Sequence, residues 1–353
     1  MALAAELFRI NDPWMLLPLG LCVTVSVLWL HFRFSAVDAA VLAVCLYDVA
    51  TWILNPITGM YAARISLTGL CAYLLLREAS CRAESISLFL KLSAGIAGIA
   101  LAITLASFSI WTRAVHGAGF TDVYPFRFLF RPFGYITNAW ASVWLPVLGM
   151  LAMGIYRIDR WRKVFGICWV LASVTMLLSF SRGAFVSWAV YVTVLCVSMA
   201  TWRYRLVLVA VCVFIVGTVW MLLPTETGTT LAMKRTESQR QSTESRFRAT
   251  EQAMTVIKEH LWTGTGNGSY TLAMDRVLNE DSTRPYTSYA PNVVVQVLVE
   301  KGLTGMMLYI GLCAAVVIYW IKYRKKKTMT AIAACLLAVG VKEMTMSIML
   351  ADG

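Results

Sequence analysis

The chain has 353 residues, of which 59% are hydrophobic and 14% are charged, and its mean hydropathy is +0.68. Soluble domains carry about 25% charged residues, so this composition excludes an ordinary soluble fold. The formal net charge of +12 would indicate nucleic-acid binding in a soluble protein. In an apolar chain it indicates basic cytoplasmic loops instead, so we expect a membrane protein that binds no nucleic acid.

Apolar segments recur along the chain at about 20 residues each, the length that crosses a bilayer as a helix. They predict an all-α, polytopic transmembrane bundle of about ten spans. The start of the chain lacks the basic region, short apolar core and small-residue cleavage site of a signal peptide. The predicted spans are 14–32, 37–55, 59–76, 87–111, 136–156, 163–181, 184–202, 205–223, 292–321 and 329–350.

Clusters of Lys and Arg at 157–163, 203–205 and 322–327 lie on one side of the membrane if each predicted span crosses once. The excess of Lys and Arg in cytoplasmic loops identifies that side as the cytoplasm. Residues 112–135 and the long loop 224–291 are then extracytoplasmic. Both ends of the chain are also outside, which suggests a missing terminal span. The predicted organisation is N-terminal membrane helices, an outer loop and C-terminal membrane helices, at 1–223, 224–291 and 292–353.

The outer loop contains a stretch of helical periodicity that begins near Arg246. We expect an amphipathic helix along the membrane surface, with its apolar face on the helix bundle or on lipid headgroups. The glycines that alternate after this helix either present N–H groups to a phosphate or form a plain turn. The apolar residues at helical spacing are Phe247, Met254, Ile257 and Leu261, and the glycines are Gly264, Gly266 and Gly268.

Several arginines stand where an anionic group would meet the outer surface. Arg182 lies between two apolar blocks, where a charge needs a partner or a water-filled cavity unless it extends to the headgroups. Arg246 and Arg248 open the amphipathic helix and face either an anionic ligand or solvent. Together with Arg131 they form a candidate phosphate site, because guanidinium matches phosphate oxygens.

Other polar residues inside the predicted spans are few. Asp48 is the acid that looks deepest, and the adjacent Lys342 and Glu343 point in different directions on a helix. We interpret most of these residues as ties between helices or as boundary residues. The cysteines lie in or beside apolar spans without a CxxC pair, so we expect free thiols, no metal and no cofactor.

Four short segments are distinctive in their order along the chain, in their spacing and in their placement beside predicted spans. The Ser-Arg-Gly segment from Ser181 opens a span, and the helix led by Arg246 ends in Leu-Trp-Thr-Gly-Thr-Gly at 261–266. The others are Gly134-Tyr-Ile-Thr-Asn138 and Pro291-Asn292, the latter followed by Gly302-Leu-Thr-Gly305. Over roughly residues 127–310 the chain thus resembles the O-antigen ligase and O-antigen polymerase family of bacterial inner-membrane proteins.

The resemblance implies glycosyl transfer outside the cytoplasm, without a metal. The donor is a glycan on undecaprenyl diphosphate, and the acceptor is another lipid-linked glycan or the lipid A core. Arg182 and Arg246 would stabilise the departing diphosphate, while Asn292 would orient the acceptor hydroxyl for Asp275, Glu280 or Asp281 to deprotonate. Further substrate-binding candidates are Arg131, Arg248, Ser181 and Asn138.

The chain departs from the family's ligases at Pro291, where they carry a histidine. Proline offers neither a base nor a side-chain donor, but it suits the start of a helix, with Asn292 just inside that helix. We therefore favour a polymerase over a ligase that has relocated its base. A transporter or flippase for the same lipid-linked glycan is the alternative of another class, and the scarcity of deep charges argues against it.

Overall fold

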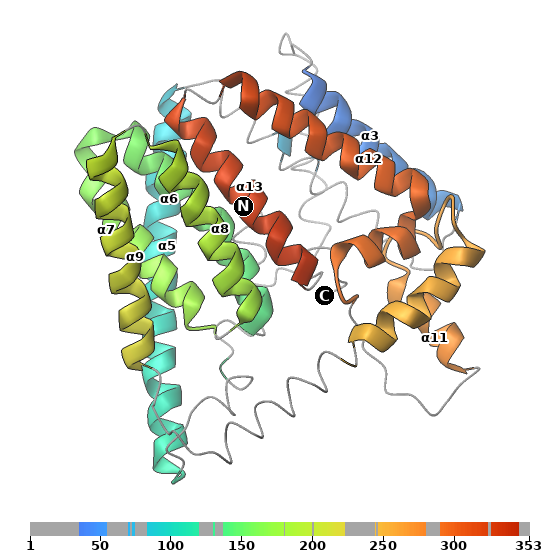
Figure 1. The fold of residues 1–353 in the computed structure, drawn as a ribbon, viewed down its shortest axis with the longest axis horizontal. Coiled ribbons are helices and arrows are strands. Elements are labelled where there is room, and N and C mark those ends of the chain that lie inside the picture. The colour runs from blue at the N-terminus through green and yellow to red at the C-terminus, as the bar shows by residue number, and fades with distance from the viewer. Residues whose placement is uncertain are drawn as a thin grey trace. The chain divides into compact units, whose positions relative to one another are not determined.

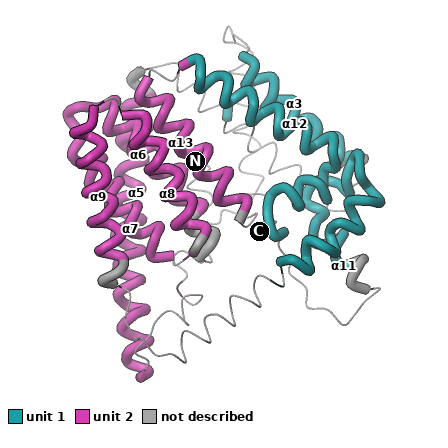
Figure 2. Tube along the Cα trace, viewed as in Figure 1, with its two compact units in different colours: residues 1–83, 239–322, 350–353 teal, residues 84–238, 323–349 magenta. Residues whose placement is uncertain are grey.

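The computed structural model describes residues 35–54, 70, 73–74, 83–119, 130, 137–179, 181–199, 201–222, 244, 246–279, 290–323 and 326–345. Every regular element within these residues is a helix, which confirms the all-α class (Figure 1). The predicted span at 14–32 and most of that at 59–76 lie outside the described residues. The chain divides into two compact units, residues 1–83, 239–322 and 350–353, and residues 84–238 and 323–349 (Figure 2).

The unit formed by residues 84–238 and 323–349 contains most of the apolar helices. Each coincides with a predicted span, and their ends differ from the predicted ends by a few residues. α5 is the exception, because it continues to Gly117 through residues that were expected in the outer segment 112–135. The helices are α5 (Ala83–Gly117), α6 (Thr137–Arg157), the 3-10 turn η5 (Asp159–Trp161), α7 (Arg162–Leu177), α8 (Arg182–Ser198), α9 (Trp202–Leu222) and α13 (Lys327–Thr345).

Within this unit α6 packs against α7 and α13, and α13 also packs along α8. Gly149 permits a close approach of α6 to α13, since a Cβ there would lie 2.8 Å from the Cβ of Cys335. The buried Tyr191 hydroxyl of α8 donates a hydrogen bond to a carbonyl of α6 at 2.9 Å. Ser142 Oγ donates to Glu343 Oε1 at 3.1 Å, so Glu343 is a tie between helices, as predicted.

The other unit contains α3 (Ala36–Leu54), an unlabelled helix at residues 246–259, α11 (Tyr270–Asn279) and nearly all of α12 (Val293–Tyr323). α3 begins with a reciprocal cap: the Asp38 carboxylate accepts the N–H and the hydroxyl of Ser35, at 2.7 and 2.5 Å, and the Asp38 N–H donates to Ser35 Oγ at 3.2 Å. Tyr73 also donates to Asp38, at 2.6 Å. Asp38 is thus a boundary residue that satisfies the free backbone groups at a helix start.

The described helices include candidate membrane spans. By length and apolar composition the candidates are Ile86–Gly117, Trp202–Val219 and Val293–Tyr323, and Ser142–Arg157 and Gly183–Ser198 are shorter apolar helices. A span needs about 20 residues, so the first three are long enough to cross alone. The chain is therefore a membrane protein with several candidate spans, while the number of about ten stays a prediction.

Candidate active site

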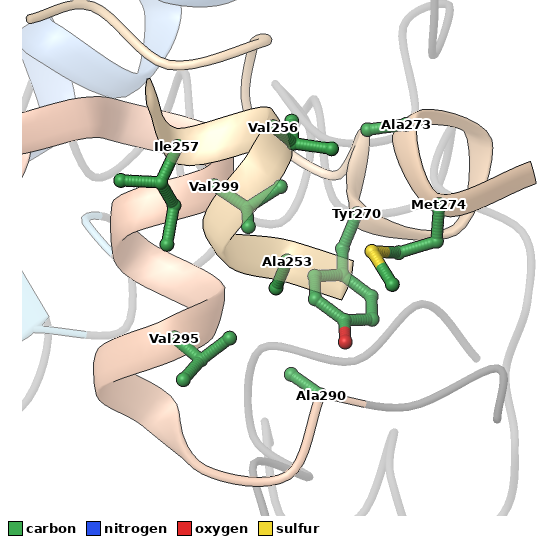
Figure 3. Close-up of a cluster of buried hydrophobic side chains, with 9 residues drawn as sticks. All are labelled: Ala253, Val256, Ile257, Tyr270, Ala273, Met274, Ala290, Val295 and Val299. Atoms are coloured by element: carbon green, nitrogen blue, oxygen red, sulfur yellow. The ribbon is translucent and has the colours of Figure 1, made fainter. Parts of the chain in front are cut away.

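The segment before α12 folds into a small helical module with its own hydrophobic core. The helix at 246–259 and α11 pack onto the first two turns of α12. Figure 3 shows side chains of these three helices meeting in one cluster. α11 is an element that the loop prediction omitted, although Tyr270, Ala273 and Met274 have helical spacing. The buried cluster consists of Ala253, Val256, Ile257, Tyr270, Ala273, Met274, Ala290, Val295 and Val299.

α12 is interrupted at Gly302, whose backbone angles are φ 62° and ψ −164°. This region is essentially restricted to glycine. In an unbroken helix, the N–H groups of Leu303 and Thr304 would donate to the carbonyl oxygens of Val299 and Glu300. The break releases these four backbone groups, and buried backbone groups of this kind need new partners.

The glycine-rich turn at 260–269 supplies a partner for each released group. Two N–H groups of the turn donate to the released carbonyls, and two carbonyls of the turn accept from the released N–H groups. The nitrogen–oxygen distances are Thr265 to Val299 2.8 Å, Gly266 to Glu300 2.8 Å, Leu303 to Leu261 2.7 Å and Thr304 to Trp262 3.2 Å. The turn and the helix break therefore form one hydrogen-bonded unit.

This close approach requires glycine on both sides. A Cβ on Gly264 would lie 2.4 Å from the Glu300 carbonyl oxygen, and one on Gly302 would lie 2.5 Å from the Trp262 carbonyl carbon. Both glycines also have positive φ. Of the two readings of the alternating glycines, the turn is therefore confirmed. The phosphate reading is wrong for the N–H groups of Thr265 and Gly266, because α12 carbonyls already accept from them.

A buried ion pair ties α3 to α12 beside the break. Lys301 Nζ lies 2.6 Å from Asp48 Oδ1, and the two side chains are 1% and 6% exposed. Lys301 Nζ also donates to the Tyr309 hydroxyl at 2.8 Å, and the Tyr47 hydroxyl donates to the Lys301 carbonyl at 2.8 Å. Asp48 is thus a tie between helices, as predicted. Lys301 was missed, although the Glu-Lys-Gly sequence at 300–302 interrupts an apolar run.

The predicted amphipathic helix is present, but a different face of it is buried. Of the apolar residues expected to pack together, only Ile257 is buried. Phe247 and Met254 are 74% and 45% exposed, and Leu261, just beyond the helix, is 43% exposed. Of the two predicted alternatives, packing on protein is wrong for Phe247, Met254 and Leu261, because small side chains allow the closest helix contact, and contact with lipid headgroups stays a prediction. The buried face consists of Ala249, Ala253, Val256 and Ile257.

Arg246 and Arg248 lie on this helix and are exposed. The Arg248 guanidinium pairs with the Glu244 carboxylate, and the two side chains are 51% and 53% exposed. Exposed pairs of this kind are worth about 0–1 kcal/mol, so a phosphate can replace Glu244 at little cost. The Thr250 hydroxyl donates to the backbone carbonyl of Arg246 at 2.9 Å, and this bond does not involve the Arg246 guanidinium.

Asn292 caps the N-terminus of α12. Its Oδ1 accepts the Val295 N–H at 2.9 Å, which satisfies one of the free donors of the first turn. The residue stands just before the helix and not just inside it, so the expected register is wrong by one position, and Pro291 precedes the cap. The cap uses only the side-chain oxygen of Asn292, and the side-chain NH2 is not part of that bond.

In the other unit, Ser181 and Arg182 open α8, as the Ser-Arg-Gly segment predicted. Ser181 is extended (φ −83°, ψ 124°), and its carbonyl accepts the Phe185 N–H at 3.2 Å. Arg182 is the first helical residue, where a cation opposes the helix dipole unless an anion is bound nearby. Asn138 lies in the first turn of α6, and Arg131 lies outside the described residues.

Residues 167–310 match the O-antigen ligase family, which confirms the predicted resemblance over that range. The match extends from α7 into the second half of α12. It therefore includes Ser181, Arg182, Arg246, Asn292 and the break at Gly302. No curated protein matches the chain.

Proposed function

We propose that the chain is a glycosyltransferase that uses a glycan on undecaprenyl diphosphate as donor, on the basis of the match of residues 167–310 to the O-antigen ligase family and of the candidate membrane spans. The reaction takes place at the outer face of the bacterial inner membrane. The acceptor hydroxyl oxygen bonds to the anomeric carbon while the bond from that carbon to the diphosphate oxygen breaks. The diphosphate leaves with the electron pair, and the hydroxyl proton passes to a base.

Arg182 and Arg246 stabilise the negative charge that grows on the departing diphosphate. The observation that carries this assignment is their shared place inside the matched range, where Arg182 is the first residue of α8 and Arg246 is exposed on the helix at 246–259. At Arg182 the helix N-terminus adds its own partial positive charge and N–H groups to the cation. Preorganised donors of this type stabilise a transition state by several kcal/mol, and the step then needs no metal.

The remaining candidates bind and orient the two substrates. Arg248 exchanges its exposed partner Glu244 for a phosphate oxygen of the donor. Asn292 orients the acceptor hydroxyl through its side-chain NH2, since its side-chain oxygen caps α12. Ser181, Asn138 and Arg131 contact the glycan or its diphosphate.

We assign the acceptor as a second lipid-linked glycan, which makes the enzyme a polysaccharide polymerase. Pro291 supports this assignment, because a histidine general base is lacking at the position where the family's ligases carry one. The name of the matched family favours the other candidate, a ligase that transfers the glycan to the lipid A core.

Surface glycans of a deletion strain distinguish these functions. Loss of a polymerase leaves single repeats on the surface lipid, and loss of a ligase leaves full-length chains on the carrier lipid. A transporter would instead leave lipid-linked repeats at the inner face, which would contradict the proposal.

Arginine variants test the chemistry in the same strain. Arg182→Ala and Arg246→Ala should each lower product by about 10²–10³-fold at normal protein abundance, because a transition-state contact is lost. Arg→Lys should restore little, since a point charge lacks the planar fork of guanidinium. The matched control is Arg203→Ala, an exposed arginine at the start of α9, which should keep full activity. Full activity of either of the first two variants would remove that residue from the mechanism.

A further inference from the structure

The helix at 246–259 has a second apolar face that no described residue covers. Phe247 and Met254 lie about two helical turns apart on one face, and Leu261 follows in the turn directly after the helix, so we treat the three as one stripe. Their exposed fractions are 74%, 45% and 43%, and the adjoining Trp262 is 62% exposed. The stripe borders the buried face at Ile257, so the apolar surface continues from the core of the module outwards.

The position of this stripe relative to the membrane follows from α12. Lys322 begins the basic cluster that marks one end of the span, and about 20 residues of helix cross the hydrocarbon core. That length places the other boundary close to Gly302. Leu303 and Thr304 donate hydrogen bonds to Leu261 and Trp262, so the end of the stripe lies at the same level.

The helix also has a suitable orientation. Figure 1 shows the helix at 246–259 lying across the axis of the long second part of α12 and not continuing it. A helix that ends at the membrane boundary and lies across a membrane span follows the plane of the membrane. Lys258, which is exposed and flanks the stripe, is placed to meet anionic headgroups, and tryptophan is enriched at this depth.

We infer that the stripe of Phe247, Met254, Leu261 and Trp262 is a lipid-docking surface that rests in the headgroup region of the membrane leaflet next to the module. The occupant is the lipid itself, because the stripe lies at the membrane depth at which the apolar surface of α12 begins. Docking would hold Arg246 at headgroup depth, where the diphosphate of a lipid-linked donor lies. That consequence rests on the proposed function, whereas the docking does not.

Nitroxide labels test the surface in the full-length chain. Phe247→Cys and Met254→Cys are labelled in a background without native cysteines and reconstituted in phosphatidylethanolamine–phosphatidylglycerol vesicles. The matched control is Thr255→Cys, an exposed position on the polar face of the same helix. Collision rates with oxygen, which concentrates in lipid, and with a water-soluble nickel chelate are then measured.

Docking predicts an oxygen-to-nickel ratio at positions 247 and 254 that exceeds the ratio at position 255 by at least about threefold, because such helices reach roughly 5–10 Å into the headgroup boundary. Equal nickel access at all three positions would overturn the inference, since the stripe would then face water. Low access to both reagents at 247 and 254 would overturn it as well, since protein would then cover the stripe. None of these outcomes depends on glycosyl transfer, so the inference and the proposed function fail separately.

Discussion

Replacing Gly302 with alanine tests whether the break in α12 is an essential feature of the fold. A Cβ at this position would lie 2.5 Å from the Trp262 carbonyl carbon and 2.6 Å from the Gly264 nitrogen. Both contacts are with backbone atoms, so no flexible side chain can move aside. The glycine-only conformation costs a further 1–3 kcal/mol, roughly, for any other residue.

The turn must withdraw from α12 to make room for the methyl group. Withdrawal breaks the bonds from Leu303 and Thr304 to the turn, each worth about 0.5–1.5 kcal/mol. The combined loss is therefore about 2–6 kcal/mol. At about 2–4 °C per kcal/mol, the apparent melting temperature of the purified protein should fall by roughly 5 °C or more.

Gly311→Ala is the matched control in the same helix. No atom lies within 4 Å of a Cβ at Gly311, and alanine is a better helix former than glycine by about 1 kcal/mol. Thermal unfolding in detergent should therefore show Gly311→Ala at or above the wild-type temperature. If Gly302→Ala unfolds at the same temperature as Gly311→Ala, then the hydrogen-bonded turn does not hold the break, and the reasoning is refuted.

Three further predictions concern the ion pair, the helix cap and the topology. Lys301→Met should cost about 3–5 kcal/mol by leaving the Asp48 carboxylate buried and unpaired, and combining it with Asp48→Asn should recover part of the loss. Thermal unfolding of the wild type, the two single variants and the double variant measures this. Additive losses of stability would mean that the two residues are uncoupled. Asn292→Asp keeps the cap and removes the amide donor, so it should unfold normally and lose product, and an active variant would limit Asn292 to capping. A reporter fusion at Gly228 should report an extracytoplasmic position, and one at Lys326 a cytoplasmic position. Cytoplasmic activity at Gly228 would contradict the orientation and with it the proposed chemistry.

The sequence alone predicted the helical class and the long apolar helices among the described residues, but not α11. Segments such as α5 and α9 are apolar for about the thickness of a bilayer, and this pattern has few other interpretations. Asp48 was also predicted as a tie between helices, because a buried charge needs a partner. Its partner was missed, since Lys301 lies far away in sequence and pattern reasoning does not reveal which helices meet.

The module before α12 was predicted less well. The face of the helix at 246–259 depends on what packs against it, and α11 and the start of α12 accept Ala253 and Val256 in place of Phe247 and Met254. The break at Gly302 was missed for a related reason. A Gly-x-x-Gly sequence inside an apolar run is compatible with an unbroken helix, and only the partner turn with Gly264 shows that the helix must open there.

The most direct test is transfer by the purified protein in vesicles that contain only lipid-linked oligosaccharide as substrate. The account predicts longer lipid-linked chains together with free undecaprenyl diphosphate, without a nucleotide sugar and in the presence of a metal chelator. Arg182→Ala and Arg246→Ala should lower both products by about 10²–10³-fold. If the wild-type protein moves the lipid-linked oligosaccharide across the bilayer and releases no undecaprenyl diphosphate, then it is a transporter, and the central claim is contradicted.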